Sequence, residues 1–170
     1  MGYPSAAEIP LLATGSRYLN WGLLLDHIPH LKEHFAALGI PADASDWLCG
    51  VWGAFQFYDD LADGDEITRA DVDRELWSGM VTMPSNPFFM ARCQTLLPVL
   101  ALQILKWQAS DHAERNGAAD ARSYVWRAGF YDIVLMVTHL CGGADAAKSR
   151  AVLSLYGETL AEYLEEFPNA

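Results

Sequence analysis

The stretch that decides the fold runs from residue 45 to residue 64 and has the sequence SDWLCGVWGAFQFYDDLADG. Its first residue, Ser45, is of a type that commonly caps the N-terminus of a helix. Its last residue, Gly64, is of the type that most often follows the C-terminus of one. Between them the apolar residues do not alternate with polar residues as they do in a half-buried strand. These signals predict a helix over Asp46 to Ala62.

The same punctuation divides the rest of the chain into helical lengths. Thr68 and Asp71 have the spacing of a capping box, Pro29 and Pro98 predict a break and a bend, and Gly117 predicts a stop. No segment has the alternation and turn residues typical of a strand. We therefore predict an all-α bundle of six or seven helices in a single domain, residues 1–170. The helices expected besides 46–62 cover residues 8–25, 29–39, 68–82, 87–116, 119–141 and 144–167.

Composition and charge limit the function. The chain has 170 residues, 52% of them hydrophobic, which excludes intrinsic disorder. Its 22 acidic and 11 basic side chains give a net charge of −11. A chain this acidic is not expected to bind nucleic acid or an anionic membrane directly, because both need a basic surface.

Cysteine usage and targeting signals indicate the compartment. The three cysteines form no C-x-x-C pair and lie in apolar stretches, as reduced, buried cysteines do. The longest apolar run, Leu96 to Leu102, contains Pro98 and is much shorter than the roughly 20 residues that span a bilayer. No signal peptide is evident at the N-terminus. We predict a soluble, cytoplasmic protein.

Three aspartates near the end of the predicted 46–62 helix form the first candidate site. Asp59 and Asp63 are four residues apart and Asp60 and Asp63 three apart, so on a helix all three carboxylates share its last turn. This position disfavours negative charge, because the C-terminus of a helix carries partial negative charge itself. A divalent cation such as Mg²⁺ would relieve the conflict. The alternative is an ordinary solvated helix end.

The segment from Ala54 to Asp65, AFQFYDDLADGD, resembles the first aspartate-rich helix of squalene and phytoene synthases. Residues 124–129, YVWRAG, also resemble a Y-x-x-x-A-G helix of that family. The resemblance implies an all-α class I isoprenoid synthase, in which Asp59, Asp60 and Asp63 would hold Mg²⁺ bridged to a substrate diphosphate. The second aspartate motif of the family is absent from this sequence.

Asp132 is the candidate catalytic residue outside this cluster. It lies in an apolar helical run, residues 130–140, FYDIVLMVTHL. A carboxylate in such a helix must be paired, hydrogen-bonded or neutralised, because burying a bare charge is costly. Asp132 could act as a general base beside the aspartate cluster. The alternative is a structural ion pair or hydrogen bond to another helix.

Negative charge is concentrated between Asp59 and Glu75, where eight acidic residues face two arginines, a net charge of −6. Such a surface would attract a basic protein and speed its association at low salt. The favoured hypothesis is therefore a non-enzymatic protein that binds a basic protein partner, in an inhibitory, immunity-type or assembly-accessory role. It needs no cofactor; the alternative, a magnesium-dependent enzyme acting on a phosphate or diphosphate, would need Mg²⁺. The residues expected to contact the partner are Asp65, Asp71, Asp73 and Glu75.

The six tryptophans are spread over the predicted helices, and we expect most of them in the core, as large apolar anchors between helices. Some could instead form an interface, where tryptophan is enriched. They are Trp21, Trp47, Trp52, Trp77, Trp107 and Trp126.

Overall fold

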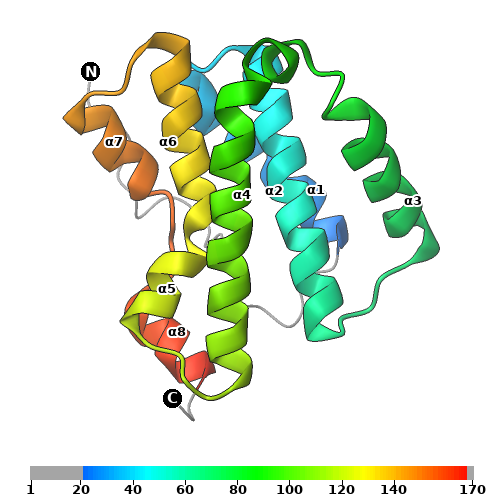
Figure 1. Ribbon diagram of the computed structural model, residues 1–170, viewed down its shortest axis with the longest axis vertical. Coiled ribbons are helices and arrows are strands. Elements are labelled where there is room, and N and C mark those ends of the chain that lie inside the picture. The colour runs from blue at the N-terminus through cyan, green and yellow to red at the C-terminus, as the bar shows by residue number, and fades with distance from the viewer. Residues whose placement is uncertain (1–20, 168–170) are drawn as a thin grey trace. The chain divides into compact units, whose positions relative to one another are not determined.

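The computed structural model describes residues 21–167, and side chains from residue 28 onward. The described part is all-α, as predicted, and contains no strand (Figure 1). Its eight α-helices exceed the predicted six or seven because two of the expected helices are each divided in two. A π-helix, η2, follows α3. The elements are α1 (Trp21–Ala37), α2 (Ala42–Asp63), α3 (Arg69–Trp77), η2 (Ser78–Thr82), α4 (Pro87–Arg115), α5 (Ala121–Arg127), α6 (Gly129–Gly142), α7 (Ala146–Leu153) and α8 (Leu160–Glu166).

The described chain divides into two compact units, residues 21–96 and residues 97–167. We call them the N-terminal unit and the C-terminal unit. The first ten residues of α4 belong to the N-terminal unit and the remainder to the C-terminal unit. The single domain expected for residues 1–170 stays a prediction.

The core of the N-terminal unit lies between α1 and α2. Leu31 and Phe35 of α1 and Trp47 of α2 are almost completely buried. The Trp47 ring also stacks on Phe89 of α4, with ring centroids 5.4 Å apart, a separation typical of favourable aromatic pairs. Burial of these large side chains fixes α1 and the start of α4 on α2.

Two helix boundaries in this unit differ from the prediction. α1 continues through Pro29, where we expected a break. A proline inside a helix loses one backbone hydrogen bond, but the burial of Leu31 and Phe35 just beyond it offsets that loss. α2 begins after Pro41 and not after Ser45, whose backbone N–H bonds to the carbonyl of Pro41. Ser45 is therefore a buried first-turn residue and not the N-cap.

Two glycine positions in this unit are important for the elements that follow α2. Gly64 ends α2 in the left-handed region, with φ of 79°, as the sequence predicted. Gly50 lies against the π-helix segment: a Cβ atom there would be 2.9 Å from Cγ of Met83. A side chain at position 50 would therefore force the Met83 side chain to move.

In the C-terminal unit the helix predicted over 119–141 is divided into α5 and α6 at Ala128. Gly129, the first residue of α6, is buried against the side chain of Gln103 in α4: a Cβ atom there would lie 2.5 Å from Oε1 of Gln103. The stop predicted at Gly117, with φ of 63°, is confirmed.

The helix predicted over 144–167 is also two helices, α7 and α8. Thr159 begins α8 with a capping box, in which its hydroxyl accepts a bond from Glu162 N–H and the Glu162 carboxylate accepts from Thr159 N–H. Residues 154–158, which include Gly157, separate the two helices. The predicted division from α6 at Gly142–Gly143 is confirmed.

α4 is the one helix of the described part that is long and apolar enough to cross a membrane, by length and composition alone. Only 17% of its most apolar 18-residue window is buried. One such helix does not by itself establish a membrane span. The cytoplasmic location stays a prediction.

Candidate functional site

Helix α3 directs a carboxylate toward the interior of the N-terminal unit. Asp71 is only 6% exposed. It completes the predicted capping box with Thr68, whose backbone N–H donates to its Oδ2 over 3.0 Å, and it pairs with Arg74. Burial alone would raise the pKa of Asp71, but the hydrogen bonds from Thr68 and Arg74 outweigh burial and lower that pKa. Asp71 therefore stabilises the N-terminus of α3.

Glu75 lies four residues later, on the same side of α3, and is 7% exposed. Burial raises the pKa of its carboxyl, and the nearby Arg74 opposes that rise. The side of α3 that faces inward thus carries two acidic side chains. In an ordinary surface helix the inward side is apolar and the charges face solvent.

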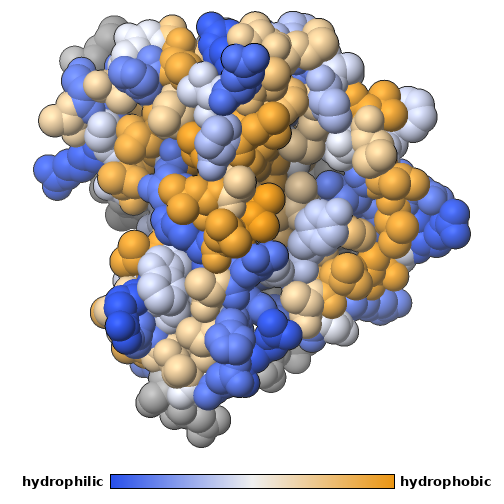
Figure 2. Space-filling view, viewed as in Figure 1, coloured by the Kyte–Doolittle hydropathy of each residue, from blue (hydrophilic) through white to orange (hydrophobic). Residues whose placement is uncertain are grey.

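The exposed side of α3 and η2 carries large apolar side chains beside the charged Arg69, Asp73 and Arg74. Leu76 is 62% exposed, Trp77 66% and Met80 73%. Figure 2 shows orange, hydrophobic atoms on part of the surface in the region of α3, with blue, hydrophilic atoms beside them. Two of the three acidic side chains of α3, those of Asp71 and Glu75, are therefore buried, while its large apolar side chains are exposed; we call this arrangement the inversion of α3. We call the outward set the docking face; it comprises Val72, Leu76, Trp77, Met80 and Val81.

Of the tryptophans expected mostly in the core, Trp77 matches the alternative of a surface position, and Trp107 and Trp126 are half-buried. Trp47 and Trp52 are in the core, at 1% and 5% exposure, but Trp77 is one of the most exposed large side chains of the described chain. The spacing of Val72, Leu76 and Met80 is visible in the sequence. This spacing predicts an apolar stripe along a helix, but it does not show whether the stripe faces the core or the solvent.

The four residues expected to contact a partner are not equivalent. Asp71 and Glu75 are buried, because they form the inward side of α3. Asp73 is exposed and forms an ion pair with Arg69, with 3.0 Å between Oδ1 and Nε. Asp65 is half-buried in the loop that precedes α3. Of the predicted set, only Asp65 and Asp73 reach the surface.

The aspartate cluster lies at the C-terminus of α2, as predicted. Burial and the neighbouring carboxylates of Asp59, Asp65, Asp63 and Asp71 raise the pKa of Asp60 to about 6. The crowding of negative charge inferred from the sequence is thus present. Asp59 and Asp63 take part in further contacts within the protein.

A magnesium site needs several carboxylate oxygens directed at one point. Among the described residues, no group of three or more histidine, cysteine, aspartate or glutamate side chains is placed to hold a metal ion. This holds for Asp59, Asp60 and Asp63, which do not fit Mg²⁺ as they stand. The magnesium interpretation stays a prediction, and we derive no chemistry from it.

Asp132 forms an ion pair within the C-terminal unit. Nζ of Lys106, on α4, donates to Oδ2 of Asp132 over 2.5 Å. This pair matches the structural alternative considered for Asp132. Asp132 belongs to the C-terminal unit, and the aspartate cluster belongs to the N-terminal unit.

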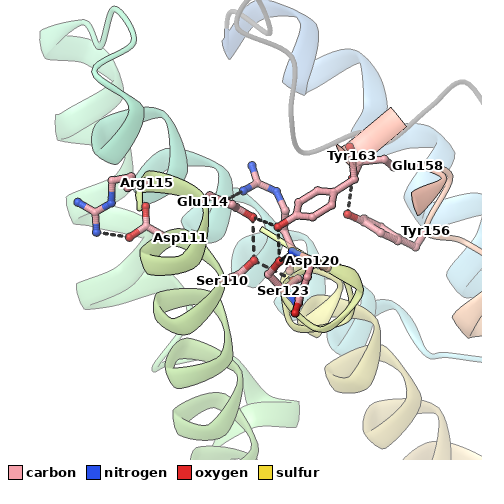
Figure 3. A network of polar contacts seen from close by, with 10 residues as sticks. Ser110, Asp111, Glu114, Arg115, Asp120, Ser123, Tyr156, Glu158 and Tyr163 are labelled. Carbon is pink, nitrogen blue, oxygen red and sulfur yellow. Dashed lines mark hydrogen bonds and ion pairs between the residues drawn. The ribbon is translucent and has the colours of Figure 1, made fainter. Parts of the chain in front are cut away.

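A buried polar network in the C-terminal unit has no counterpart in the sequence analysis (Figure 3). Nη1 of Arg127 lies 2.6 Å from Oε2 of Glu114, and the two side chains are only 5% and 6% exposed. The hydroxyls of Tyr163 and Ser110 lie 2.7 and 2.8 Å from Oε1 of the same glutamate. The Tyr163 hydroxyl is also 2.7 Å from Oγ of Ser123. The network joins α4, α5 and α8.

Glu158 adds a second buried carboxyl to this unit. The Tyr156 hydroxyl donates to its Oε2 over 2.5 Å, and the Tyr124 hydroxyl donates to its backbone carbonyl over 2.6 Å. Burial raises the pKa of Glu158, while the Tyr156 bond and Arg127 lower it. These contacts satisfy buried groups and hold α8 and the segment before it, which is a structural role.

No family model, curated protein or solved structure matches the chain.

Proposed function

We propose that the protein acts by binding a protein partner with a basic surface, through the docking face on α3 and η2. The observation that carries the proposal is the inversion of α3. A soluble protein normally exposes large apolar side chains singly, whereas a contiguous exposed patch is typical of an interaction site. Here the patch belongs to one helical segment.

The composition of the docking face supports a protein partner. Tryptophan and methionine are enriched at protein interfaces, and tryptophan is among the residues that contribute most to binding. Burying one large apolar side chain contributes about 1.5–3 kcal/mol. Leu76, Trp77 and Met80, all more than half exposed, could therefore supply much of the energy of a stable complex.

The charge around the docking face supports a basic partner. The segment from Asp59 to Glu75 has a net charge of −6. Glu66 and Asp73 are exposed, and Asp65 is half-buried. Basic residues at the rim of a partner would be attracted to this region, which would raise the association rate at low salt.

Site-specific photocrosslinking tests the proposal. p-Benzoylphenylalanine is placed at position 80 of the full chain, in the cells that naturally make the protein. The matched control carries it at Leu105 in the C-terminal unit, which is 61% exposed. We expect a discrete adduct with a basic protein from position 80, little from position 105, and loss of the adduct when Leu76→Ser is added.

The proposal is wrong if positions 80 and 105 give the same adducts, or if Leu76→Ser leaves the adduct unchanged. Leu76→Ser is a suitable probe because substitutions at exposed positions usually change stability by only about 0.5 kcal/mol. Its melting temperature, compared with that of the unsubstituted protein, confirms that the fold is retained.

A further inference from the structure

We infer that the partner docks on this face with a single amphipathic helix, and that the cationic end of that helix lies over the loop before α3. This inference rests on the proposed function and adds the shape, charge pattern and orientation of the docking element. Two features of the N-terminal unit carry it: the width of the apolar stripe and the uneven charge along it.

The stripe has the dimensions of one helix contact. Val72, Leu76 and Met80 follow each other at four-residue spacing, so they form one row along the α3–η2 segment. At about 1.5 Å per residue the row is about 12 Å long. Trp77 and Val81 form a second row beside it at the same spacing. A stripe two rows wide suits the apolar side of a single helix with anchors at i, i+4 and i+7.

The charge along this segment is polarised. Asp63, Asp65 and Glu66 precede α3; we call residues 63–66, which comprise the last residue of α2 and the start of the loop after it, the acidic loop. Beyond Glu75, in contrast, residues 76–91 contain no charged side chain at all. One end of the docking face is therefore acidic, and the other end, at η2, is neutral and apolar.

Charge complementarity then fixes the partner's orientation. A helix with lysines or arginines at one end gains favourable interactions only if that end lies at the acidic loop. Its uncharged end then lies on Met80 and Val81. A charged side chain at that end would lose its hydration without gaining an ionic partner. A helix with basic residues spread along its length would place some of them there.

Designed peptides test this inference on the full chain. Two fluorescein-labelled 18-residue helical peptides have the same composition and the same apolar side. One carries four lysines in its last two turns, and the other carries them evenly along its polar side. We expect the clustered peptide to bind about threefold to tenfold more tightly, because each exposed charge pair adds a modest amount.

Matched variants locate the effect. Asp65→Asn with Glu66→Gln should abolish the preference for the clustered peptide. The control, Glu33→Gln with Glu165→Gln, changes the net charge equally on α1 and α8 and should preserve it. Trp77→Ala should weaken both peptides about 30-fold, as loss of a central interface residue does.

A crosslinking map tests orientation directly. With a benzophenone at its lysine-rich end, the clustered peptide should form adducts in residues 63–68. With the label at the other end, adducts should fall in residues 78–83. A reversed map, equal affinity for the two peptides, or no binding by either overturns the inference. If position 80 still forms its adduct in cells, only the helical or polarised partner is rejected; if that adduct is also missing, the proposed function fails too.

Discussion

Breaking the buried ion pair of the C-terminal unit tests the account of its core. Arg127→Met removes the cation and leaves the Glu114 carboxylate at 6% exposure, where solvent cannot replace the arginine. Removing one partner of a buried pair costs about 3–5 kcal/mol, because an uncompensated charge is left behind. In a protein of this size that corresponds to a decrease in melting temperature of about 6–20 °C.

The double variant Arg127→Met with Glu114→Gln makes the test specific. The glutamine is neutral and its carbonyl oxygen can still accept bonds from the Tyr163 and Ser110 hydroxyls, so we expect at least half of the lost stability to return. Arg122→Met is the surface control, because Arg122 pairs with Asp120 in solvent; it should leave the melting temperature unchanged. Thermal unfolding followed by circular dichroism at 222 nm measures all three variants.

The reasoning is refuted if Arg127→Met lowers the melting temperature no more than Arg122→Met does. It is also refuted if the double variant is as unstable as the single one, because the loss would then come from the arginine's packing and not from the unpaired carboxylate.

Three further predictions concern single positions. The pKa of Asp60 is raised to about 6, so the folded N-terminal unit holds this proton more tightly than the unfolded chain does. The free energy of unfolding should therefore rise as pH falls from about 6 toward 4. Asp60→Asn should remove this part of the pH dependence, which urea unfolding at a series of pH values measures. Thr68→Ala removes the α3 N-cap and should cost about 1 kcal/mol, seen as faster hydrogen exchange in residues 69–77. In Gly129→Ala the new Cβ would lie 2.5 Å from Oε1 of Gln103 and would displace that side chain from its rotamer, which should cost about 0.5–1.5 kcal/mol. Gly142→Ala, with nothing within 4 Å, should avoid this steric cost, and chemical denaturation of the two variants gives the comparison.

The sequence predicts the all-α fold and many helix boundaries because those signals are local. A glycine with positive φ ends a helix whatever surrounds it, as at Gly64 and Gly117. The capping box of Thr68 and Asp71 involves residues three apart and was visible in the same way. The boundaries at Pro29 and Ser45 were wrong because packing and the preceding proline outweigh the local preference.

The docking face and the buried network could not be predicted, for two different reasons. The apolar row of α3 is visible in the sequence, but a row does not specify which side of the helix meets the core. The network depends on contacts between distant residues, such as Glu114 and Tyr163, which are 49 positions apart. No local pattern identifies such a pair. The aspartate cluster was located correctly on α2, and its electrostatic strain is reflected in the raised pKa of Asp60.

The contact between Gly50 and Met83 links the interior of the N-terminal unit to its outer surface. Met83 directly follows η2, so the position of Met80 and Val81 depends on how closely that segment lies on α2. A Cβ atom at position 50 would lie 2.9 Å from Cγ of Met83, so a larger residue there would force the Met83 side chain, or the segment that carries it, to move. Gly50, which is half-buried, therefore couples the packing of α2 to the placement of the segment that carries Met80 and Val81.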